Sequence, residues 1–471
     1  MFQEAAVMDK IYDLVRFAKN TKYEDIPADV IEGAKTLLKD AIAVAVAGTG
    51  ADGVEGALKV VRDWGGKEEA SVWVFGDRLP AHHAAFINSV LTHARDYDEV
   101  QLDAVVHTEI SVVPTVLAIA EAIGGVSGRE LLRTIVVAED IFIRIGYAIK
   151  MQSTENGWIY SSTVGYLASA VAAGVLMGLT EEQIVDAVGI AYAQTAGNQQ
   201  SARDTSLTKR MQPAYAARSA VMSAYLAREG VTGAHNVFEG RFGFFNVYIH
   251  GKADPEELTK DLGKKYYIRD LSFKSNPICG PCLSPTSAME MLIREHDIKP
   301  EEITGIDVGT NEHGVIACAE PKETKYNPQT VVDAQFSIPY AVCKVASKGT
   351  IGLKDMTEEG LNDDVMRSLL DKVHVYMEES IEKQFGRGVS PAKVTVHTTR
   401  GDFTAQPFPK GHPENPMDAQ DMRRKLFDCF GFGLYDVKEG AEDRILAMID
   451  HMEDEADATA LTKLLNDSFI R

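Results

Sequence analysis

The residues best suited to chemistry gather between positions 93 and 107 of the sequence. Asp96, Asp98 and Glu99 place three carboxylates within four residues, with His93 before them and His107 after them. Carboxylates this close repel one another unless a cation, hydrogen-bond donors or water offset the repulsion. Histidine has a pKa near neutrality and often serves in proton transfer. The stretch therefore indicates an acid–base site, and the alternative is a solvated acidic loop or a helix cap.

The overall charge indicates what such a site needs. The chain has 69 Asp and Glu against 48 Lys and Arg, a formal net charge of −21, which repels nucleic acid. An acidic protein that binds an anionic substrate must gather some of its cations locally. The five cysteines, an odd number in 471 residues, favour reduced thiols in a cytoplasm over a disulfide framework. We expect neither export nor a membrane span, because no apolar run reaches the roughly 20 residues that a bilayer requires.

The elements that must position this stretch are mostly helices. At 471 residues the chain is long enough for two domains, because single cores stop growing near about 250 to 300 residues. Up to about residue 262, apolar residues recur every three or four positions, which is typical of helices that bury one face. Capping-box patterns predict helix starts at Ser127 and Thr180, and Pro213 is expected to open another helix.

Between about residues 265 and 410 the pattern changes to that of an α+β segment. Runs of β-branched or alternating residues predict strands, and after Pro416 the helical spacing returns. Strands are expected at 303–308, 373–377, 394–397 and 403–406, and helices at 284–296, 333–346, 418–430 and 442–465. The predicted fold is mainly α with α+β: a discontinuous all-helical domain of residues 1–267 and 409–471, on which the tail packs back, and an α+β domain of residues 268–408.

Several motifs, taken in chain order, resemble the MmgE/PrpD family over nearly the whole sequence. Residues 93–114 resemble its acidic run followed by a histidine and a long helix, and residues 208–213 resemble its KRLH segment. The other matching segments are 127–132, 143–146, 273–280, 332–341 and 411–416. The resemblance implies a small di- or tricarboxylate substrate, no cofactor or metal, and a homodimer formed through the helical part.

The resemblance also assigns roles to individual residues. It places Asp96 and His107 in the active site, lined by Lys209 and Lys274. Such cations can hold substrate carboxylates and stabilise the enediolate that forms when a proton α to a carboxylate is removed. In this interpretation His107 or a lysine removes the proton, and Asp96 orients a donor or the substrate hydroxyl. Tyr160 is a further acid–base candidate, and the candidates for substrate binding are Arg210, Ser161, Cys279 and Tyr326.

The sequence departs from the family pattern at three positions. Val100 stands where the dehydratase and decarboxylase branches have a threonine, and Ile159 and Pro281 stand where they have histidines. The leading hypothesis is a cofactor-independent lyase of the dehydratase type. Because the departures remove groups that protonate a leaving group, an epimerase or isomerase using the same proton abstraction is the first alternative. A catalytically silent carboxylate-binding homologue is the second.

Other motifs carry weaker signals. Cys279-Gly-Pro-Cys282 has redox spacing but lacks a thioredoxin-like context and a second ligand pair for zinc, so a tight turn beside the pocket is the preferred interpretation. The acidic stretch lacks the second cluster with which helical prenyl or terpene synthases hold magnesium and diphosphate. His235 and His313 are expected to be ordinary surface histidines. The glycine-rich segments lack the context of a nucleotide-binding motif.

Overall fold

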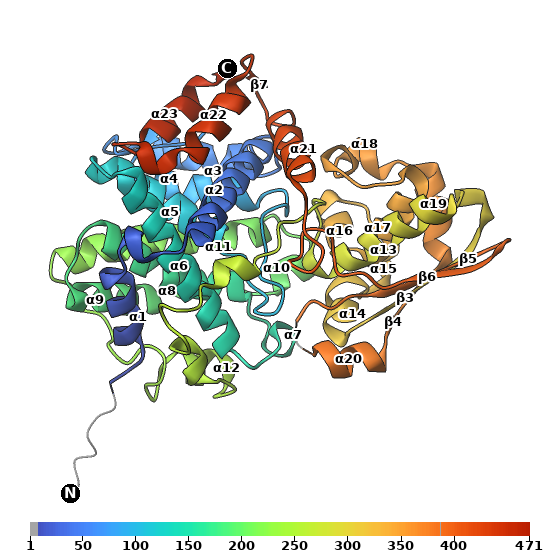
Figure 1. The fold of residues 1–471 in the computed structure, drawn as a ribbon, viewed down its shortest axis with the longest axis horizontal. Helices are drawn as coiled ribbons and strands as arrows, with labels where there is room; N and C mark the ends of the chain where they lie inside the picture. Colours follow the sequence, from blue (N-terminus) through green and yellow to red (C-terminus); the bar gives the residue numbers. More distant parts are fainter. Residues whose placement is uncertain (1–7, 387) are drawn as a thin grey trace, which may run out of the picture.

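A large helical domain and a smaller α+β domain lie side by side in the computed structural model, which describes residues 8–386 and 388–471 (Figure 1). Within these residues no helix combines the length and the apolarity needed to cross a bilayer. The larger domain contains α1 (Ile11–Asn20), α2 (Ala28–Gly48), α3 (Val54–Trp64), α4 (Ala81–His93), α5 (Glu109–Ile123), α6 (Gly128–Ala148), α7 (Ser153–Asn156), α8 (Tyr160–Leu176), α9 (Glu181–Tyr192), α10 (Gln200–Arg203), α11 (Thr208–Arg228), α12 (Phe244–Ile249), α21 (Ala419–Phe430), α22 (Ala441–Asp450) and α23 (Ala460–Asp467), with the short strand pairs β1 (Ala70–Ser71) with β2 (Arg78–Leu79) and β7 (Asp436–Val437) with β8 (Phe469–Ile470).

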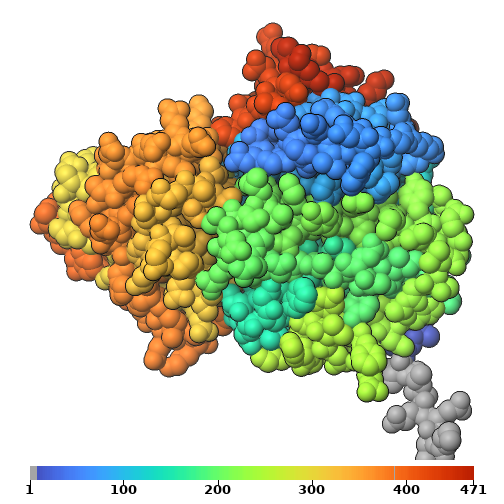
Figure 2. Space-filling model, turned by 180° about the vertical axis from the view of Figure 1, so that it is seen from behind, coloured from blue at the N-terminus to red at the C-terminus, as the bar shows by residue number. Residues whose placement is uncertain are grey.

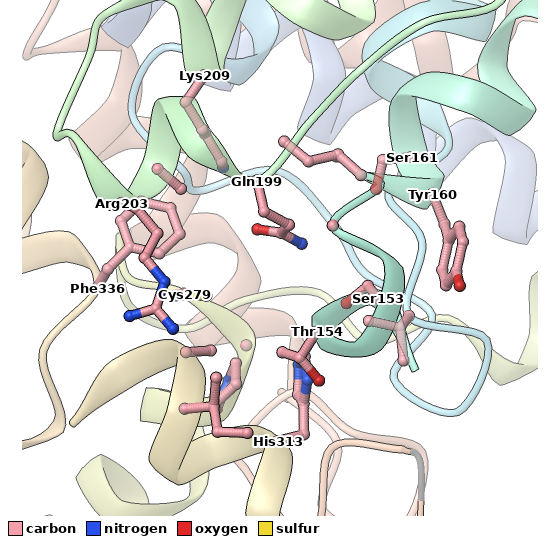
Figure 3. A pocket seen from close by; sticks show the side chains of 18 of the residues that line it. Ser153, Thr154, Tyr160, Ser161, Gln199, Arg203, Lys209, Cys279, His313 and Phe336 are labelled. Carbon is pink, nitrogen blue, oxygen red and sulfur yellow. The ribbon is translucent and has the colours of Figure 1, made fainter. Parts of the chain in front are cut away.

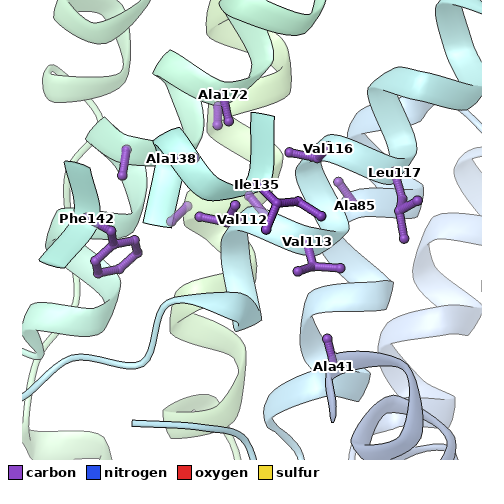
Figure 4. Packing of buried hydrophobic residues seen from close by; sticks show 14 of the residues in the cluster. Ala41, Ala85, Val112, Val113, Val116, Leu117, Ile135, Ala138, Phe142 and Ala172 are labelled. Carbon is purple, nitrogen blue, oxygen red and sulfur yellow. The ribbon is translucent and has the colours of Figure 1, made fainter. Parts of the chain in front are cut away.

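Three helices, α5, α6 and α8, form the centre of the larger domain and are buried over most of their length. Figure 4 shows Val113 and Val116 of α5 near Ile135 of α6, with alanines of α2, α4 and α8 around them. Small residues let these helices approach closely. A Cβ at Gly48 of α2 would overlap the backbone oxygen of Leu91 in α4, so this crossing requires glycine.

The smaller domain has one four-stranded sheet with the order β4-β3-β5-β6. β3 (Ile303–Thr310) runs parallel to β4 (Val373–Met377) and antiparallel to β5 (Lys393–Thr398), which pairs with β6 (Gly401–Ala405). All four strands lie where the sequence predicts them. Helix α13 packs on β5 and β6, and α14 and α17 pack on β4. The helices of this domain are α13 (Gly280–His296), α14 (Glu312–Cys318), α15 (Lys322–Lys325), α16 (Val331–Gln335), α17 (Ile338–Lys348), α18 (Glu358–Leu361), α19 (Asp364–Leu369) and α20 (Glu379–Phe385).

The chain forms two hydrophobic cores, one in each domain. The larger is built by residues of 11–271 and 426–469 with Leu353, and the smaller by residues of 278–396 with Val100 and Leu102. The C-terminal tail therefore packs on the first domain, as expected, and Figure 2 shows it (red) resting on the N-terminal helices (blue). The exact domain boundaries at 267/268 and 408/409 stay a prediction.

Capping signals place two helix starts correctly, and three other helix predictions need correction. Ser127 and Thr180 accept backbone N–H groups at the starts of α6 and α9, as predicted. Pro213 lies inside α11 and does not open it. The predicted helix 333–346 is two helices, because Ser337 accepts from the backbone N–H of Tyr340 and starts α17 anew. The predicted helix 442–465 is likewise divided into α22 and α23.

A buried ion pair ties the tail to the first helices. Lys425 of α21 and Asp40 of α2 are 2% and 0% exposed, and Nζ of Lys425 lies 2.7 Å from Oδ1 of Asp40. Lys425 also donates to the backbone oxygen of Tyr97 at 2.9 Å, next to the acidic stretch. Such a pair adds little net stability, but removing one partner leaves an uncompensated charge in the interior.

Lys425→Ala should therefore lower the free energy of unfolding by about 3 to 5 kcal/mol. Urea unfolding followed by circular dichroism measures the loss. Arg423→Ala is the matched control, because it removes an exposed pair with Asp443 from the same helix and should cost less than about 1 kcal/mol. Equal losses in the two variants would contradict the role assigned to the buried pair.

Candidate active site

A cavity of about 430 Å³ lies between the two domains, next to the acidic stretch. The helical domain lines it with the connection from α4 to α5, the start of α8 and the segment from α10 to α11. The smaller domain lines it with the start of α13 and with α14 and α15. Figure 3 shows Lys209 and Ser161 on one side of the cavity and Cys279 and His313 on the other. Domain interfaces of this kind are common ligand sites.

Asp96 lies buried among the charged groups of the wall. Its Oδ1 accepts a hydrogen bond from Nζ of Lys209 at 2.7 Å, and Nζ of Lys274 lies 3.3 Å from its Oδ2 and 2.7 Å from its backbone oxygen. Burial alone would raise the pKa of Asp96, but the two lysines outweigh it and hold the pKa below its usual range. Its φ of +52° lies in the left-handed region, which aspartate tolerates. Asp96 is therefore a carboxylate at neutral pH.

Asp98 connects two histidines. Its Oδ1 lies 3.0 Å from Nδ1 of His93, and its Oδ2 lies 2.7 Å from Nδ1 of His107. Lys209 donates to Nε2 of His93 at 2.9 Å. Because an ammonium can only donate, Nε2 of His93 must accept, and the ring proton lies on Nδ1 and points at Asp98. Burial, followed by the charge of Lys209, lowers the pKa of His93 to about 4, so this ring is neutral at pH 7.

His107 has one ring nitrogen left for a ligand. Its Nδ1 lies 2.7 Å from the backbone oxygen of Glu99, in addition to its contact with Asp98. Its backbone N–H donates to Oγ of Ser161 at 3.0 Å. The side chain is 16% exposed and lines the cavity. With Nδ1 donating to the Glu99 carbonyl and facing the Asp98 carboxylate, Nε2 is the acceptor that can take a proton from a ligand, which is the arrangement of a general base.

The acidic stretch is a folded part of the interior and not a solvated loop. Asp98 and Glu99 are both 0% exposed, and Oε1 of Glu99 accepts from the backbone N–H and the hydroxyl of Thr108, both at 2.5 Å, at the start of α5. Glu109 and Glu139 are fully buried behind it, and burial raises the pKa of each well above its usual range. Burial thus disfavours ionisation of these two carboxyls, in contrast to Asp96 beside the cavity.

Six of the expected site residues lie on the cavity wall: Asp96, His107, Lys209, Tyr160, Ser161 and Cys279. Their functions differ from one another. Ser161 holds the backbone of His107 through its hydroxyl. The hydroxyl of Tyr160 donates to the backbone oxygen of Met151 at 3.0 Å and points away from Gln199 and the cavity in Figure 3. Tyr160 therefore does not replace a missing histidine as the acid–base group.

Three further expected residues lie off the wall. Lys274 is fully buried behind Asp96, so it compensates that carboxylate and does not reach a substrate. Arg210 is buried, and its Nη1 donates to the backbone oxygen of Asp52 at 3.2 Å. Tyr326 is turned toward the sheet, where its hydroxyl accepts from a backbone N–H of β4 at 3.2 Å. For these three residues the sequence predicts a segment close to the cavity, but their side chains point away from it.

The wall also holds two residues that the sequence did not single out, Arg203 and Lys325, of which Lys325 is 4% exposed. His313, expected to be an ordinary surface histidine, is 7% exposed and lines the cavity as well, so that expectation was wrong. Lys325 precedes Tyr326 in the sequence, and the turn of α15 brings the lysine to the cavity instead of the tyrosine. No motif marks Arg203, which ends α10.

The three positions where the sequence is expected to depart from the family pattern all lie on this wall. Val100, Ile159 and Pro281 present apolar side chains to the cavity. Val105 also lines the cavity and has a φ of +58°, a strained value for a β-branched residue. These four side chains therefore offer no proton donor to the cavity.

Two sets of side chains have ligand atoms close enough to suit a metal ion, within 4.8 Å of one another: His93 with Asp96 and Asp98, and Asp98 with Glu99 and His107. The observed bonds leave little place for a cation, because the ammonium of Lys209 already bonds both Asp96 and His93. Nδ1 of each histidine is directed at Asp98. The charge of the carboxylates is thus compensated by side chains.

Cys279 and Cys282 are free thiols at the start of α13. The neighbouring Cys318 and burial raise the pKa of Cys279 well above its usual range, and burial raises that of Cys282. A redox-active thiol requires the opposite shift. The structure therefore favours the interpretation of this motif as a turn that shapes the pocket.

Comparisons with known proteins agree with this architecture. The model of the MmgE/PrpD N-terminal domain matches residues 12–257, and that of the MmgE/PrpD C-terminal domain matches residues 277–452. The chain is 27% identical to the cis-aconitate decarboxylase-like protein oryM of Aspergillus oryzae, over 88% of this chain and 89% of the relative. It is 27% identical to a cis-aconitate decarboxylase of Aspergillus terreus, over 96% and 95% of the two chains. It is 24% identical to the cis-aconitate decarboxylase of Mus musculus, over 94% and 91%.

Asp98→Asn should remove the carboxylate that faces Nδ1 of both histidines. Asparagine keeps the size of aspartate but carries no charge to stabilise an imidazolium. Lys209 still donates to Nε2 of His93, and the Glu99 carbonyl still accepts from Nδ1 of His107, so both rings should keep the Nδ1–H tautomer. Proton and nitrogen-15 NMR should instead show weaker Nδ1–H hydrogen bonds in the variant, as an upfield shift of the Nδ1–H protons. Turnover should fall by about 10- to 100-fold or more. Asp204→Asn, at an exposed aspartate beside the cavity, is the control, and identical spectra for Asp98→Asn and wild type would refute the assignment.

The stability of the protein should fall as the pH falls from about 6.5 toward about 4. The pKa of His93 is lowered from 6.5 to about 4 in the folded protein, so between these values the unfolded chain binds a proton that the folded chain does not. The free energy of unfolding should drop by about 3 kcal/mol across this range because of His93. Chemical unfolding of wild type and His93→Gln at several pH values isolates the effect. Parallel pH profiles of the two proteins would be inconsistent with a neutral buried His93.

Proposed function

The chain belongs to the MmgE/PrpD family, and we propose that it is a cofactor-independent lyase acting on a small di- or tricarboxylate. The observation that carries this proposal is the position of His107, held by Asp98, beside the Asp96–Lys209 pair on a cavity between two domains. The names of relatives that are 24 to 27% identical over most of both chains support a carboxylate substrate.

His107 moves the proton at the carbon α to a substrate carboxylate. Nε2 accepts or returns this proton, and the Asp98 carboxylate beside Nδ1 stabilises the imidazolium that forms. Lys209 binds the neighbouring substrate carboxylate and stabilises the enediolate that develops there. Lys209 also bonds His93, whose ring lies 5.5 Å from that of His107, so the cation and the base belong to one connected network.

Carbon dioxide is the leaving group that fits this wall best. When the bond to a departing carboxylate breaks, its electron pair moves into the adjacent unsaturated carboxylate, and the imidazolium of His107 supplies the proton that replaces carbon dioxide. This leaving group needs no proton of its own, which suits a wall where Val100, Ile159 and Pro281 provide no acid. The relatives named as cis-aconitate decarboxylases support this choice.

Dehydration is the second candidate, and epimerisation is the third. In a dehydration His107 removes the α-proton and hydroxide leaves with a proton from an acid, for which the Lys209 ammonium is available. An epimerase needs a second acid–base group, and His313 from the smaller domain is the histidine on the wall that could take this role. Dehydration and epimerisation share the enediolate formed by removal of the α-proton, whereas decarboxylation forms its intermediate by loss of carbon dioxide.

We also propose that the protein acts as a cytoplasmic homodimer. Val60 and Trp64 of α3 are 46% and 60% exposed, and Tyr215 and Met222 of α11 are 40% and 41% exposed. Arg218 of α11 lies 5.7 Å from the ring centre of Trp64, so the two helices share this apolar face. Exposed apolar patches of this kind often mark protein interfaces, and five free thiols suit a reducing compartment.

Proton NMR in deuterium oxide tests the proposed reaction, with cis-aconitate, citrate, 2-methylcitrate, malate and aspartate-derived dicarboxylates as the panel. Decarboxylation of cis-aconitate should give new alkene signals with one deuterium incorporated and carbon dioxide released. A new alkene from a hydroxy acid would indicate the dehydratase, and exchange of an α-proton without loss of a group would indicate the epimerase.

His107→Gln should lower the rate of this reaction by about 100- to 10,000-fold, the usual contribution of a positioned acid–base group. His235→Gln is the control, because His235 is 36% exposed and bonds Asp186 away from the cavity. Full activity in His107→Gln, or no change in any compound with the wild type, would reject the proposal.

A further inference from the structure

Lys325 differs from the other buried lysines of the protein. Five lysines are at most 4% exposed: Lys35, Lys274, Lys325, Lys344 and Lys425. Four of them have a carboxylate oxygen within 2.7 to 3.3 Å of Nζ. Lys325 has no carboxylate within ion-pair distance among residues 8–386 and 388–471. A buried charge without a counter-charge is costly, so its presence calls for a partner that is not part of the chain.

The surroundings of Lys325 point toward the cavity. The residue lines the cavity wall from the α+β domain, and its Nζ lies 5.7 Å from the ring centre of Phe336. Lys209, from the helical domain, lies 4.6 Å from the same ring. Phe336 thus has an ammonium from each domain near it, and the two cations are close enough for one small molecule to contact both.

A third cation lies on the same wall. Arg203 ends α10 and lines the cavity, and Figure 3 shows its guanidinium extending from beside Phe336 toward Cys279. It too has no carboxylate within ion-pair distance in the described part of the chain. Lys209, in contrast, already shares its charge with Asp96 at 2.7 Å. Glu320 also lines the cavity but forms no ion pair with either side chain. Among the described residues, Lys325 and Arg203 are therefore the lysine and arginine of the wall that lack an ion-pair partner.

We propose that Lys325 and Arg203 form a second carboxylate subsite, apart from the reacting centre at Lys209 and His107. The inference rests on the proposed function for the class of ligand and adds where a second carboxylate of the di- or tricarboxylate binds. One is held at Lys209, where the chemistry takes place, and another is held at Lys325 and Arg203 and fixes the orientation of the molecule. A guanidinium can bind a carboxylate through two parallel hydrogen bonds, and an ammonium adds a third donor. The substrate thereby joins the two domains across the cavity.

Titration calorimetry at low salt tests this subsite with propane-1,2,3-tricarboxylate, a saturated compound that offers three carboxylates, and with butanoate, which offers one. Lys325→Met removes the charge and keeps a long apolar stem. It should weaken tricarboxylate binding by about 10- to 100-fold and leave butanoate binding within about twofold. Lys325→Arg should retain most of the tricarboxylate affinity. Lys322→Met is the matched control, because Lys322 is an exposed lysine of the same helix.

A second readout separates a binding role from a structural one. Without ligand, Lys325→Met should unfold at the same or a higher denaturant concentration than the wild type, because the buried charge has been removed. A variant that is less stable but binds the tricarboxylate normally would overturn the subsite. Arg203→Gln, at an exposed residue, provides an independent test and should also weaken tricarboxylate binding by about tenfold.

The failure of this inference is distinguishable from failure of the proposed function. If the wild type binds the tricarboxylate and all variants bind it equally, the subsite is wrong and the proposed reaction is unaffected. If the wild type binds neither compound in calorimetry and changes no member of the carboxylate panel in NMR, both proposals are wrong.

Discussion

Two ionised carboxylates, Asp96 and Asp98, lie where water cannot solvate them, and compensation of their charge governs the surrounding structure. The compensating groups come from distant parts of the chain: His93 from the end of α4, Lys209 from the start of α11, and Lys274 from the connection into the smaller domain. Loss of any one would leave a charge exposed to a medium of low polarity. The charge network and the junction between the domains are therefore one structure, since the bonds that neutralise the carboxylates also hold both domains against the same stretch.

Residue types and spacing were enough to find the centre of this network, but not the direction in which each side chain points. Periodicity and capping signals predict helices well because both depend on neighbours within a few residues, as at Ser127 and Thr180. Whether Tyr326 or Lys325 meets the cavity depends on the rotation of the short helix α15, which long-range packing sets. The composition of the acidic stretch also indicated a site. Only the fold shows that lysines and histidines, and not water, compensate the charges of its carboxylates. The position of Arg203 carried no local signal at all.

The environment separates chemically similar groups into different states. Asp96 and Asp98 stay ionised beside lysines and histidines, whereas burial and then neighbouring carboxylates raise the pKa of Glu109 and Glu139 well above its usual range. The same contrast applies to the cations, because Lys274 is fully engaged by Asp96 while Lys325 has no acidic partner in the described chain. Such divergence in the state of similar side chains is a general mark of functional sites. The cavity therefore has three parts. Charges are balanced around Asp96 and His107, the wall at Val100 and Ile159 is apolar, and the part at Lys325 carries positive charge without an ion-pair partner.

The order of segments along the chain has a consequence for biosynthesis. Helices α21 to α23 complete a core that α1 and α2 begin, so during translation the helical domain cannot close until those late segments have left the ribosome. The inserted domain draws almost all of its core from residues 278–396 and can reach its native packing earlier. Until the tail has been synthesised, Asp40 on α2 lacks its ion-pair partner Lys425. The apolar surface of α2 that the tail covers stays exposed during this time. The order of synthesis thus places the last assembly step at the tail, where Lys425 also bonds the backbone of Tyr97 beside the acidic stretch of the cavity.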